Sequence, residues 1–242
     1  MRRRKLVLVA HLIGATLLVA SIGLYSWIVS TDDGDGTHEP IHIVADDYFN
    51  AENGVSSGTG TESDPFVISD MVIEVSSDPE LEEQGIRISH TTAHFVVRNV
   101  TIYSDGHMTG PSERYPVGIF LNSAENATVE SCTILGLSIG IELAISPGAT
   151  IIGNTITGCG VGVHSSLSAS IGYQHGLSIA DNEFVNNTVG IHIDYSPWDI
   201  EVNGNSFMDS CEPVLIEGCR GIVFQDNLIG VTGAGGCPSS EG

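Results

Sequence analysis

Apolar and polar residues alternate along short stretches of this chain, and the alternation recurs with a period close to 22 residues. Most copies open with Gly, an aliphatic residue, a variable residue and a second aliphatic residue, although the copy at Gly162 has Ser165 in the last of these positions. Short alternating runs joined by Gly and Asn predict two or three β-strands per copy. The openings begin at Gly85, Gly118, Gly140, Gly162 and Gly190, with a degenerate one at Pro213, and their spacings are 33, 22, 22, 28 and 23 residues.

One such copy cannot bury its apolar face alone, so the copies are expected to stack on one another as a solenoid. A coil of about 22 residues suits a three-faced parallel β-helix, with neighbouring coils about 4.8 Å apart. We therefore predict an all-β, right-handed, pectin-lyase-like parallel β-helix of six or seven coils. Its proposed parts are the N-terminal cap and first coil at residues 41–75, the repeats at 76–230 and a short Gly-rich tail at 231–242.

A second column of equivalent positions runs through the closing half of each copy. Stacked Asn side chains can bond to one another and to the turn backbone, so we predict an inward structural ladder. Cys132 occupies the ladder position one coil earlier and is expected to be a small buried side chain. The column reads Val100, Cys132, Asn154, Asn182, Asn205 and Asn227.

These two halves, together with the entry segment GTGTESDPFVI at residues 58–68, resemble the NosD-like or CASH (carbohydrate-binding proteins and sugar hydrolases) family of right-handed β-helix proteins. The resemblance covers about residues 41–230 and implies a surface protein of the archaeal type. Members include copper-site maturation factors, surface-layer proteins, epimerases and polysaccharide-degrading enzymes, so the resemblance implies the fold more narrowly than the function.

The N-terminus reads MRRRK and is followed by a run at residues 6–30 without charged residues. That run is long enough to span a bilayer as a helix, and its basic flank indicates an uncleaved anchor with the rest of the chain outside the cytoplasm. A cleavable signal peptide is the alternative. Residues 31–40 are predicted to be an acidic linker.

Beyond Lys5 the chain holds four Arg, no Lys and all 30 acidic residues, a formal charge of 4 − 30 = −26. Such a surface is not expected to bind nucleic acid, because phosphate must be neutralised by Lys and Arg. It is typical either of a protein from a salty environment or of an acidic surface protein. Glycosylation sequons stand at Asn99, Asn126 and Asn186.

The five cysteines at positions 132, 159, 211, 219 and 237 cannot all pair within one chain, because their number is odd. Cys211 and Cys219 could form a bridge across a turn. The short Gly-rich tail covers little of the last coil, so self-association through that coil is expected.

Residues between the inward aliphatic positions of each opening should point outward. This places Glu142, His164 and His192 above one another on three consecutive coils, with Asp194 and Glu217 in the neighbouring column. Stacked imidazoles beside carboxylates can bind a divalent transition ion such as Cu or Zn. Solvated side chains on an exposed face are the alternative. Two insertions, near residues 105–115 and 168–174, would flank this face as walls of a groove and bring His107 and His175 close to it.

Two further functions stay open. Asp194 and Glu217 on adjacent coils could supply the two carboxyl groups of a glycoside hydrolase, although a lyase acting on acidic polymers would need more basic residues than this face offers. Phe120, Tyr195 and Trp198 could stack on sugar rings. We rank a non-catalytic surface module binding glycan or protein first, a NosD-type copper-binding or maturation module second, and a polysaccharide hydrolase or lyase third.

Overall fold

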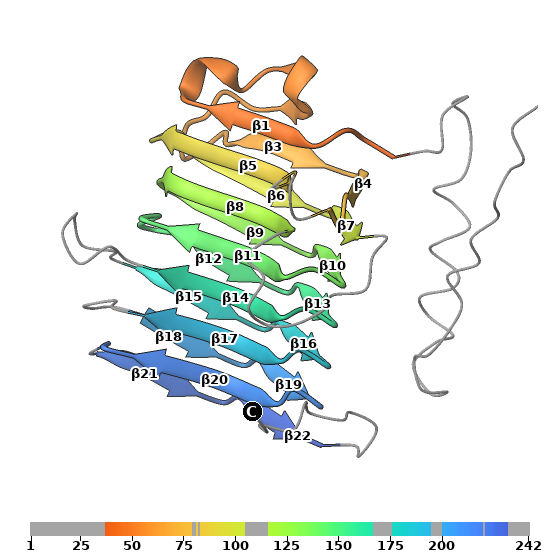
Figure 1. Cartoon of the computed structure of the whole chain (residues 1–242). Coiled ribbons are helices and arrows are strands. Elements are labelled where there is room, and N and C mark those ends of the chain that lie inside the picture. Colours follow the sequence, from red (N-terminus) through yellow and green to blue (C-terminus); the bar gives the residue numbers. More distant parts are fainter. Residues whose placement is uncertain are drawn as a thin grey trace, which may run out of the picture. The chain divides into compact units, whose positions relative to one another are not determined.

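The structure is a computed structural model, and it describes residues 37–78, 81, 83–104, 116–166, 176–194, 200–219 and 221–231. The described strands form a parallel β-helix, in which each coil gives one strand to each of three sheets (Figure 1). They make up seven coils, from β1 to β22. The prediction of an all-β parallel solenoid is confirmed.

The first sheet holds the strands that begin each copy, in the order β1 (Ile41–Val44), β5 (Gln84–Thr91), β8 (Val117–Ala124), β11 (Ile139–Ala144), β14 (Val161–Ser166), β17 (Val189–Asp194) and β20 (Glu212–Glu217). The second sheet holds β4 (Val72–Val75), β7 (Thr101–Ser104), β10 (Thr133–Leu135), β13 (Thr155–Thr157), β16 (Glu183–Val185), β19 (Ser206–Met208) and β22 (Leu228–Gly230). The third sheet holds β2 (Val55–Ser57), β3 (Phe66–Ser69), β6 (Phe95–Arg98), β9 (Ala127–Glu130), β12 (Thr150–Ile152), β15 (Leu177–Ala180), β18 (Ile200–Asn203) and β21 (Ile222–Gln225). Among these strands only β2 and β3 pair in antiparallel fashion.

The core lies between the three sheets, and identical positions stack through it. The aliphatic residues of the openings from Gly85 to Gly190, such as Ile141 and Leu143, are fully buried, whereas Ile216 in the last, degenerate opening is exposed. The Gly of an opening lies close to the backbone of the next coil: a Cβ on Gly140 would lie 2.6 Å from the Gly162 carbonyl oxygen and 2.9 Å from a methyl carbon of Ile156. The recurrent Gly therefore follows from close packing between adjacent coils.

The Asn ladder predicted from the sequence is present and buried. Asn154 Nδ2 donates to Asn182 Oδ1 at 2.9 Å and to the Val129 carbonyl at 3.0 Å, while the Asn154 backbone N–H donates to the same Oδ1 at 2.9 Å. Asn182 and Asn205 repeat this arrangement down to Asn227. Because each amide satisfies backbone groups that the turn leaves without partners, the ladder holds the corner between the third and second sheets.

Cys132 takes the ladder position in the coil before Asn154. Its backbone N–H donates to Asn154 Oδ1 at 2.9 Å, and its Sγ lies 3.6 Å from the Val97 carbonyl oxygen. The side chain is buried, as predicted. Burial raises the pKa of the Cys132 thiol to about 12, and it does the same for Cys159.

A second corner carries a shorter version of the ladder, which sequence reasoning missed. Asn187 is buried, accepts a hydrogen bond from the Cys159 backbone N–H at 2.8 Å and donates to the Ile156 carbonyl at 2.9 Å. The repeat could have revealed this corner, because Cys159 and Asn187 occupy the same position in successive copies, two residues after the end of a second-sheet strand.

The described cysteines do not pair as proposed. Cys211 is disulfide-bonded, whereas Cys132, Cys159 and Cys219 are thiols. The bridge suggested between Cys211 and Cys219 is therefore wrong. The Cys219 Sγ lies 3.2 Å from the Glu217 carbonyl oxygen and 3.5 Å from that of Ile193 on β17, so the thiol donates to backbone carbonyls instead.

At the N-terminal end, the short 3-10 helices η1 (Asp46–Tyr48) and η2 (Ala51–Asn53) follow β1. Residues 37–40, which the sequence assigns to the linker, belong to the β-helical unit at 37–242, and the His38 N–H donates to the Val72 carbonyl at 2.6 Å. The predicted anchor at residues 6–30 lies outside the described residues. Within the described part of the chain, no helix is long and apolar enough to cross a membrane.

At the other end, the last described coil forms the edge of all three sheets. Self-association through this coil stays a prediction. Its physical reason is that an edge with unpaired strands and exposed apolar side chains can pair with another chain. The exposed large apolar side chains here are Ile216, Val223, Phe224, Leu228, Ile229 and Val231.

Candidate functional site

Polar and charged side chains gather on the outward face of the first sheet. The strand register aligns Glu142 with His164 and His164 with His192 on β11, β14 and β17. Two residues further along the strands, it aligns Asp194 on β17 with Glu217 on β20. These are the two columns expected from the sequence, because side chains one residue apart on a strand point to opposite faces.

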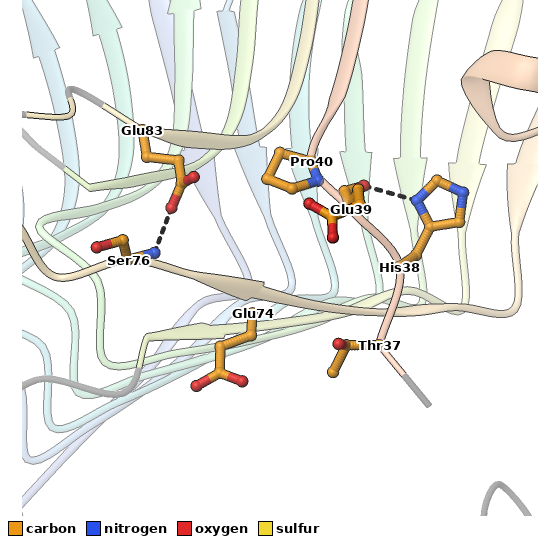
Figure 2. A pocket seen from close by; sticks show the side chains of 7 residues that line it. All are labelled: Thr37, His38, Glu39, Pro40, Glu74, Ser76 and Glu83. Carbon is orange, nitrogen blue, oxygen red and sulfur yellow. Dashed lines mark hydrogen bonds between the residues drawn. The ribbon is translucent and has the colours of Figure 1, made fainter. Parts of the chain in front are cut away.

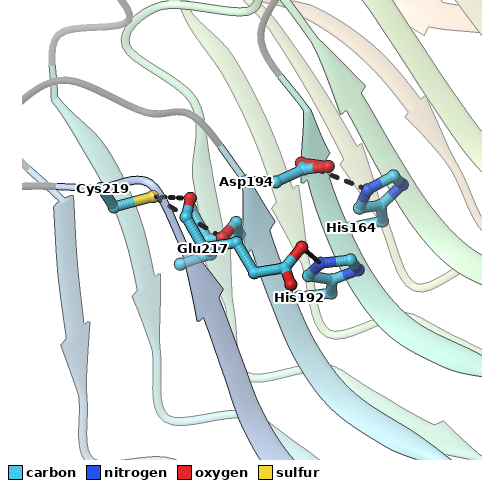
Figure 3. A network of polar contacts seen from close by, with 6 residues as sticks. His164, His192, Asp194, Glu217 and Cys219 are labelled. Atoms are coloured by element: carbon cyan, nitrogen blue, oxygen red, sulfur yellow. Dashed lines mark hydrogen bonds and ion pairs between the residues drawn. The ribbon is translucent and has the colours of Figure 1, made fainter.

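Two histidines of this face, His164 and His192, each meet a carboxylate from the following coil. His164 Nε2 lies 3.5 Å from Asp194 Oδ1, and His192 Nε2 lies 3.5 Å from Glu217 Oε2. Figure 3 shows the two pairs side by side, related by one step along the stack. We call them the inner pair (His164 and Asp194) and the outer pair (His192 and Glu217). The contact is diagonal, since the carboxylate stands two residues beyond the position in register with the histidine.

The two imidazole rings stack on each other, with centroids 4.9 Å apart and planes inclined by 23°. Nearly parallel rings point their ring nitrogens in similar directions, so they do not converge on one point between them. Both Nε2 atoms and Asp194 Oδ1 are buried and have no hydrogen-bond partner among the described residues. Buried polar atoms without partners are costly, and their presence on a ligand-binding type of side chain marks a candidate site.

The described His, Cys, Asp and Glu side chains form no group of three or more arranged to hold a metal ion. The predicted ligand set of Glu142, His164 and His192 therefore stays a prediction, and the structure offers His–carboxylate pairs instead. Glu142 is only 3% exposed although it lies on the outward column. Asp194 and Glu217, proposed as catalytic carboxylates, each face a histidine.

The aromatic residues proposed for sugar stacking fall in different parts of the chain. Phe120 lies on β8, partly buried, and the Arg87 guanidinium carbon lies 5.6 Å from the centre of its ring. This cation–π contact occupies a face of the ring on which a sugar would have to stack. Tyr195 and Trp198, and the insertions with His107 and His175, lie outside the described residues.

An open pocket of about 300 Å³ lies at the N-terminal end, away from the histidine pairs (Figure 2). Glu83 accepts a hydrogen bond from the Ser76 backbone N–H, and Glu74 accepts one from the Tyr103 hydroxyl at 3.2 Å. This pocket contains none of the candidate site residues predicted from the sequence. Its Glu74 and Glu83 carboxylates accept hydrogen bonds from neighbouring strand and turn residues. Its lining residues are Thr37, His38, Glu39, Pro40, Glu74, Ser76 and Glu83.

The three sequon asparagines all sit in left-handed turn positions, with φ of 51° at Asn99, 54° at Asn126 and 53° at Asn186. Asn186 and Asn99 are exposed. Asn99 Nδ2 donates to Asp70 Oδ1 at 2.6 Å, and this bond, after that from Ser69, helps hold the pKa of the Asp70 carboxyl below its usual value. A glycan on Asn99 would replace one of the amide hydrogens, so Asn186 is the better placed acceptor.

Taken together, the fold and the site define a parallel β-helix with a histidine–carboxylate array on one outward face. The sequence matches the family model described as periplasmic copper-binding protein (NosD) over residues 52–236. This match spans most of the chain, so the protein belongs to the NosD family. A comparison with curated proteins gave no match.

Proposed function

We propose that this protein is an extracytoplasmic copper-binding β-helix module and that the inner and outer pairs hold the ion. The observation that carries the proposal is a buried imidazole Nε2 without a hydrogen-bond partner among the described residues, facing a carboxylate oxygen at 3.5 Å, in two consecutive coils. The family description, which names copper and the periplasm, supports the same choice of ion and compartment.

The donor atoms suit the ion. Imidazole nitrogen binds copper and zinc, and N,O ligation is usual for Cu(II). With metal–ligand bonds of about 2.0–2.2 Å, a separation of 3.5 Å between the two donor atoms corresponds to an angle of about 105–122° at the ion. A hydrogen bond, in contrast, would bring the same atoms to about 2.7–3.2 Å. The spacing is compatible with two ligands of one ion, and it is equally that of a long imidazole–carboxylate ion pair.

Each pair provides two ligands, which leaves further coordination positions for water or for ligands of another protein. A site with open positions can pass its ion on, whereas a closed four-ligand site retains it. The negative charge of the external chain, 4 − 30 = −26, raises the local concentration of cations around the site. These features favour a module that captures copper and delivers it to a partner over one that stores it.

The test is a Cu(II) titration of the purified full-length chain in detergent, with Zn(II) for comparison and elemental analysis of the loaded protein. We expect stoichiometric Cu(II) binding, lost by at least about tenfold in affinity in a His164→Ala/His192→Ala variant. The matched control is His42→Ala/His94→Ala, which removes two histidines outside the pairs and should bind as the parent does; one of them, His42, stands at the far end of the same outward column. Absence of binding, or equal binding by both double variants, would refute the proposal.

Binding of a glycan or a protein partner at the cell surface, ranked first from sequence, is the competing proposal, together with anchoring through residues 6–30. Its support is the half-buried Phe120 on the same outward face. A glycan array probed with the full chain, and with Phe120→Ala alongside, separates the two. Glycan binding that depends on Phe120 and ignores the histidines would favour the sugar-binding module.

A further inference from the structure

The outward face of the first sheet changes in character between β8 and β11. From β11 onward its two columns hold the carboxylates of Glu142, Asp194 and Glu217. On β1, β5 and β8 the same two columns hold no Asp or Glu. Their residues there are His42, Val44, Arg87, Ser89, Phe120 and Asn122. An anion therefore meets less repulsion here than on the histidine–carboxylate part of the same face.

Arg87 has no acidic neighbour in register. The strand pairing aligns it with His42 on β1 and with Phe120 on β8, and the described residues give it no ion pair. Its Nε is buried without a hydrogen-bond partner. Arg98, on the third sheet, differs because it is in register with Glu130. A guanidinium without a carboxylate, in a chain with 30 acidic residues, is free to bind an anion from outside.

Two further hydrogen-bond donors stand next to Arg87. Ser89 lies two residues further along β5 on the same face, is only 1% exposed, and its Oγ has no hydrogen-bond partner in the described part of the chain. Asn122 on β8 is in register with Ser89. The Asn122 Oδ1 accepts from the Ser123 hydroxyl at 3.3 Å, so its Nδ2 group is the donor side of that amide. A buried hydroxyl without a partner is costly, and an acceptor on a ligand would satisfy it.

We propose that Arg87, Ser89 and Asn122 form an oxyanion-binding site that takes a carboxylate or sulfate group. The planar guanidinium offers paired N–H groups to such an anion and stays charged at physiological pH. Phe120 positions the guanidinium through the cation–π contact, in which the guanidinium carbon lies 5.6 Å from the ring centre. The site is independent of the proposed copper site, because its residues lie on β5 and β8 and the histidine pairs lie on β14, β17 and β20.

The test is a titration of the purified, copper-free full-length chain in detergent, followed by the NMR signals of the arginine Nε–H groups. Sodium chloride at 0.5 M gives a screening length of roughly 4 Å, which suppresses the long-range repulsion of the acidic chain but keeps a direct contact. The ligands are inorganic sulfate and glucuronate, with glucose as the uncharged counterpart of glucuronate. We expect saturable binding of an oxyanion that shifts the Arg87 signal, and no binding of glucose. Tighter binding of glucuronate would identify a carboxylated sugar as the ligand, and tighter binding of sulfate a sulfate group.

Substitutions then test the three donors. Arg87→Gln should weaken binding at least about tenfold, because it removes a charge-assisted bidentate contact. Arg87→Lys keeps the charge without the planar fork and should weaken binding at least about threefold. Ser89→Ala should weaken it about three- to tenfold, since a neutral donor is lost. Arg98→Gln is the matched control, because it changes the net charge as Arg87→Gln does and should bind as the parent does.

Three results would refute the oxyanion site. The first is that neither sulfate nor glucuronate shifts the Arg87 signal. The second is equal weakening by Arg87→Gln and Arg98→Gln, which would mean that only the overall charge matters. The third is equal binding of glucose and glucuronate. Circular dichroism checks the fold of each variant, and if Arg87→Gln does not fold, unchanged affinity in a folded Arg87→Lys variant would refute the site as well.

Discussion

The buried Asn ladder and the outward histidine array are both columns of identical positions on stacked coils, but they differ in whether their side chains have hydrogen-bond partners. In the ladder, Asn154, Asn182 and Asn205 bond to the next coil and to the backbone at 2.8–3.0 Å. In the array, His164 and His192 face carboxylates at 3.5 Å, and their Nε2 atoms have no hydrogen-bond partner among the described residues. A column with satisfied hydrogen bonds stabilises the fold, whereas a column with unsatisfied ones is available to a ligand.

The largest effect should follow from breaking the ladder. Asn182→Ala removes the acceptor of the Asn154 backbone N–H and of Asn154 Nδ2, and it removes the side-chain donor to the Ile151 carbonyl, all inside the core. Each buried polar group left unsatisfied costs roughly 1–3 kcal/mol, so we expect a loss of about 3–5 kcal/mol in the free energy of unfolding, measured by urea denaturation. Asn203→Ala on the outward side of β18 is the control, expected within about 0.5 kcal/mol. Equal losses would contradict a structural role for the ladder.

A smaller loss should follow from adding a methyl group between coils. Gly140→Ala forces a Cβ to within 2.6 Å of the Gly162 carbonyl oxygen, so the two coils must move apart. Overpacking of this kind costs about 1–3 kcal/mol, measured as a shift in the denaturation midpoint. Gly160→Ala would strike the Ser138 carbonyl oxygen at 2.7 Å and should behave alike. A midpoint unchanged in both variants would show that the coils are not closely packed here.

The buried thiols predict a dependence of stability on pH. Burial raises the pKa of Cys132 and Cys159 from 9.0 to about 12 in the folded chain. Because the pKa is raised in the folded chain, the folded state keeps its full stability below about pH 9. As the pH rises towards 12, the unfolded chain loses its thiol protons first, so the free energy of unfolding falls. At pH 10 the loss is about 1 kcal/mol for each thiol. A Cys132→Ala/Cys159→Ala variant should show a flatter decline of melting temperature between pH 8 and 10.5, and parallel declines would count against buried neutral thiols.

The smallest effect on stability is expected on the outward face. His164→Ala removes a side chain whose Nε2 makes no hydrogen bond within the described residues, so the free energy of unfolding should change by no more than about 0.5–1 kcal/mol without metal. With Cu(II) at 100 times its dissociation constant, the parent should gain about 2.7 kcal/mol and the variant much less. A large loss in the metal-free variant would make His164 a structural residue.

Much of this arrangement can be predicted from the residues. The Gly-Ile-x-Leu openings fix which residues of the first-sheet strands point inward and which point outward. The column of Glu142, His164 and His192 therefore follows from the spacing of the openings alone. The Asn column likewise predicts its own burial, since four amides at one repeat position can satisfy one another. The contacts between the columns were less predictable: the spacing places Asp194 and Glu217 beside the histidine column, but it does not say that each histidine meets the carboxylate of the following coil diagonally.

By itself, the sequence determined the repeat, the inward and outward positions and the residue types in each column, because these depend on periods along one chain. Only the tertiary structure decided which outward side chains meet. Long side chains on adjacent parallel strands reach neighbours two residues out of register, and the direction in which they lean depends on the packing of both strands. That packing also decides exposure: Asp194 is 21% exposed and Glu217 is 57% exposed, although both stand at the same repeat position.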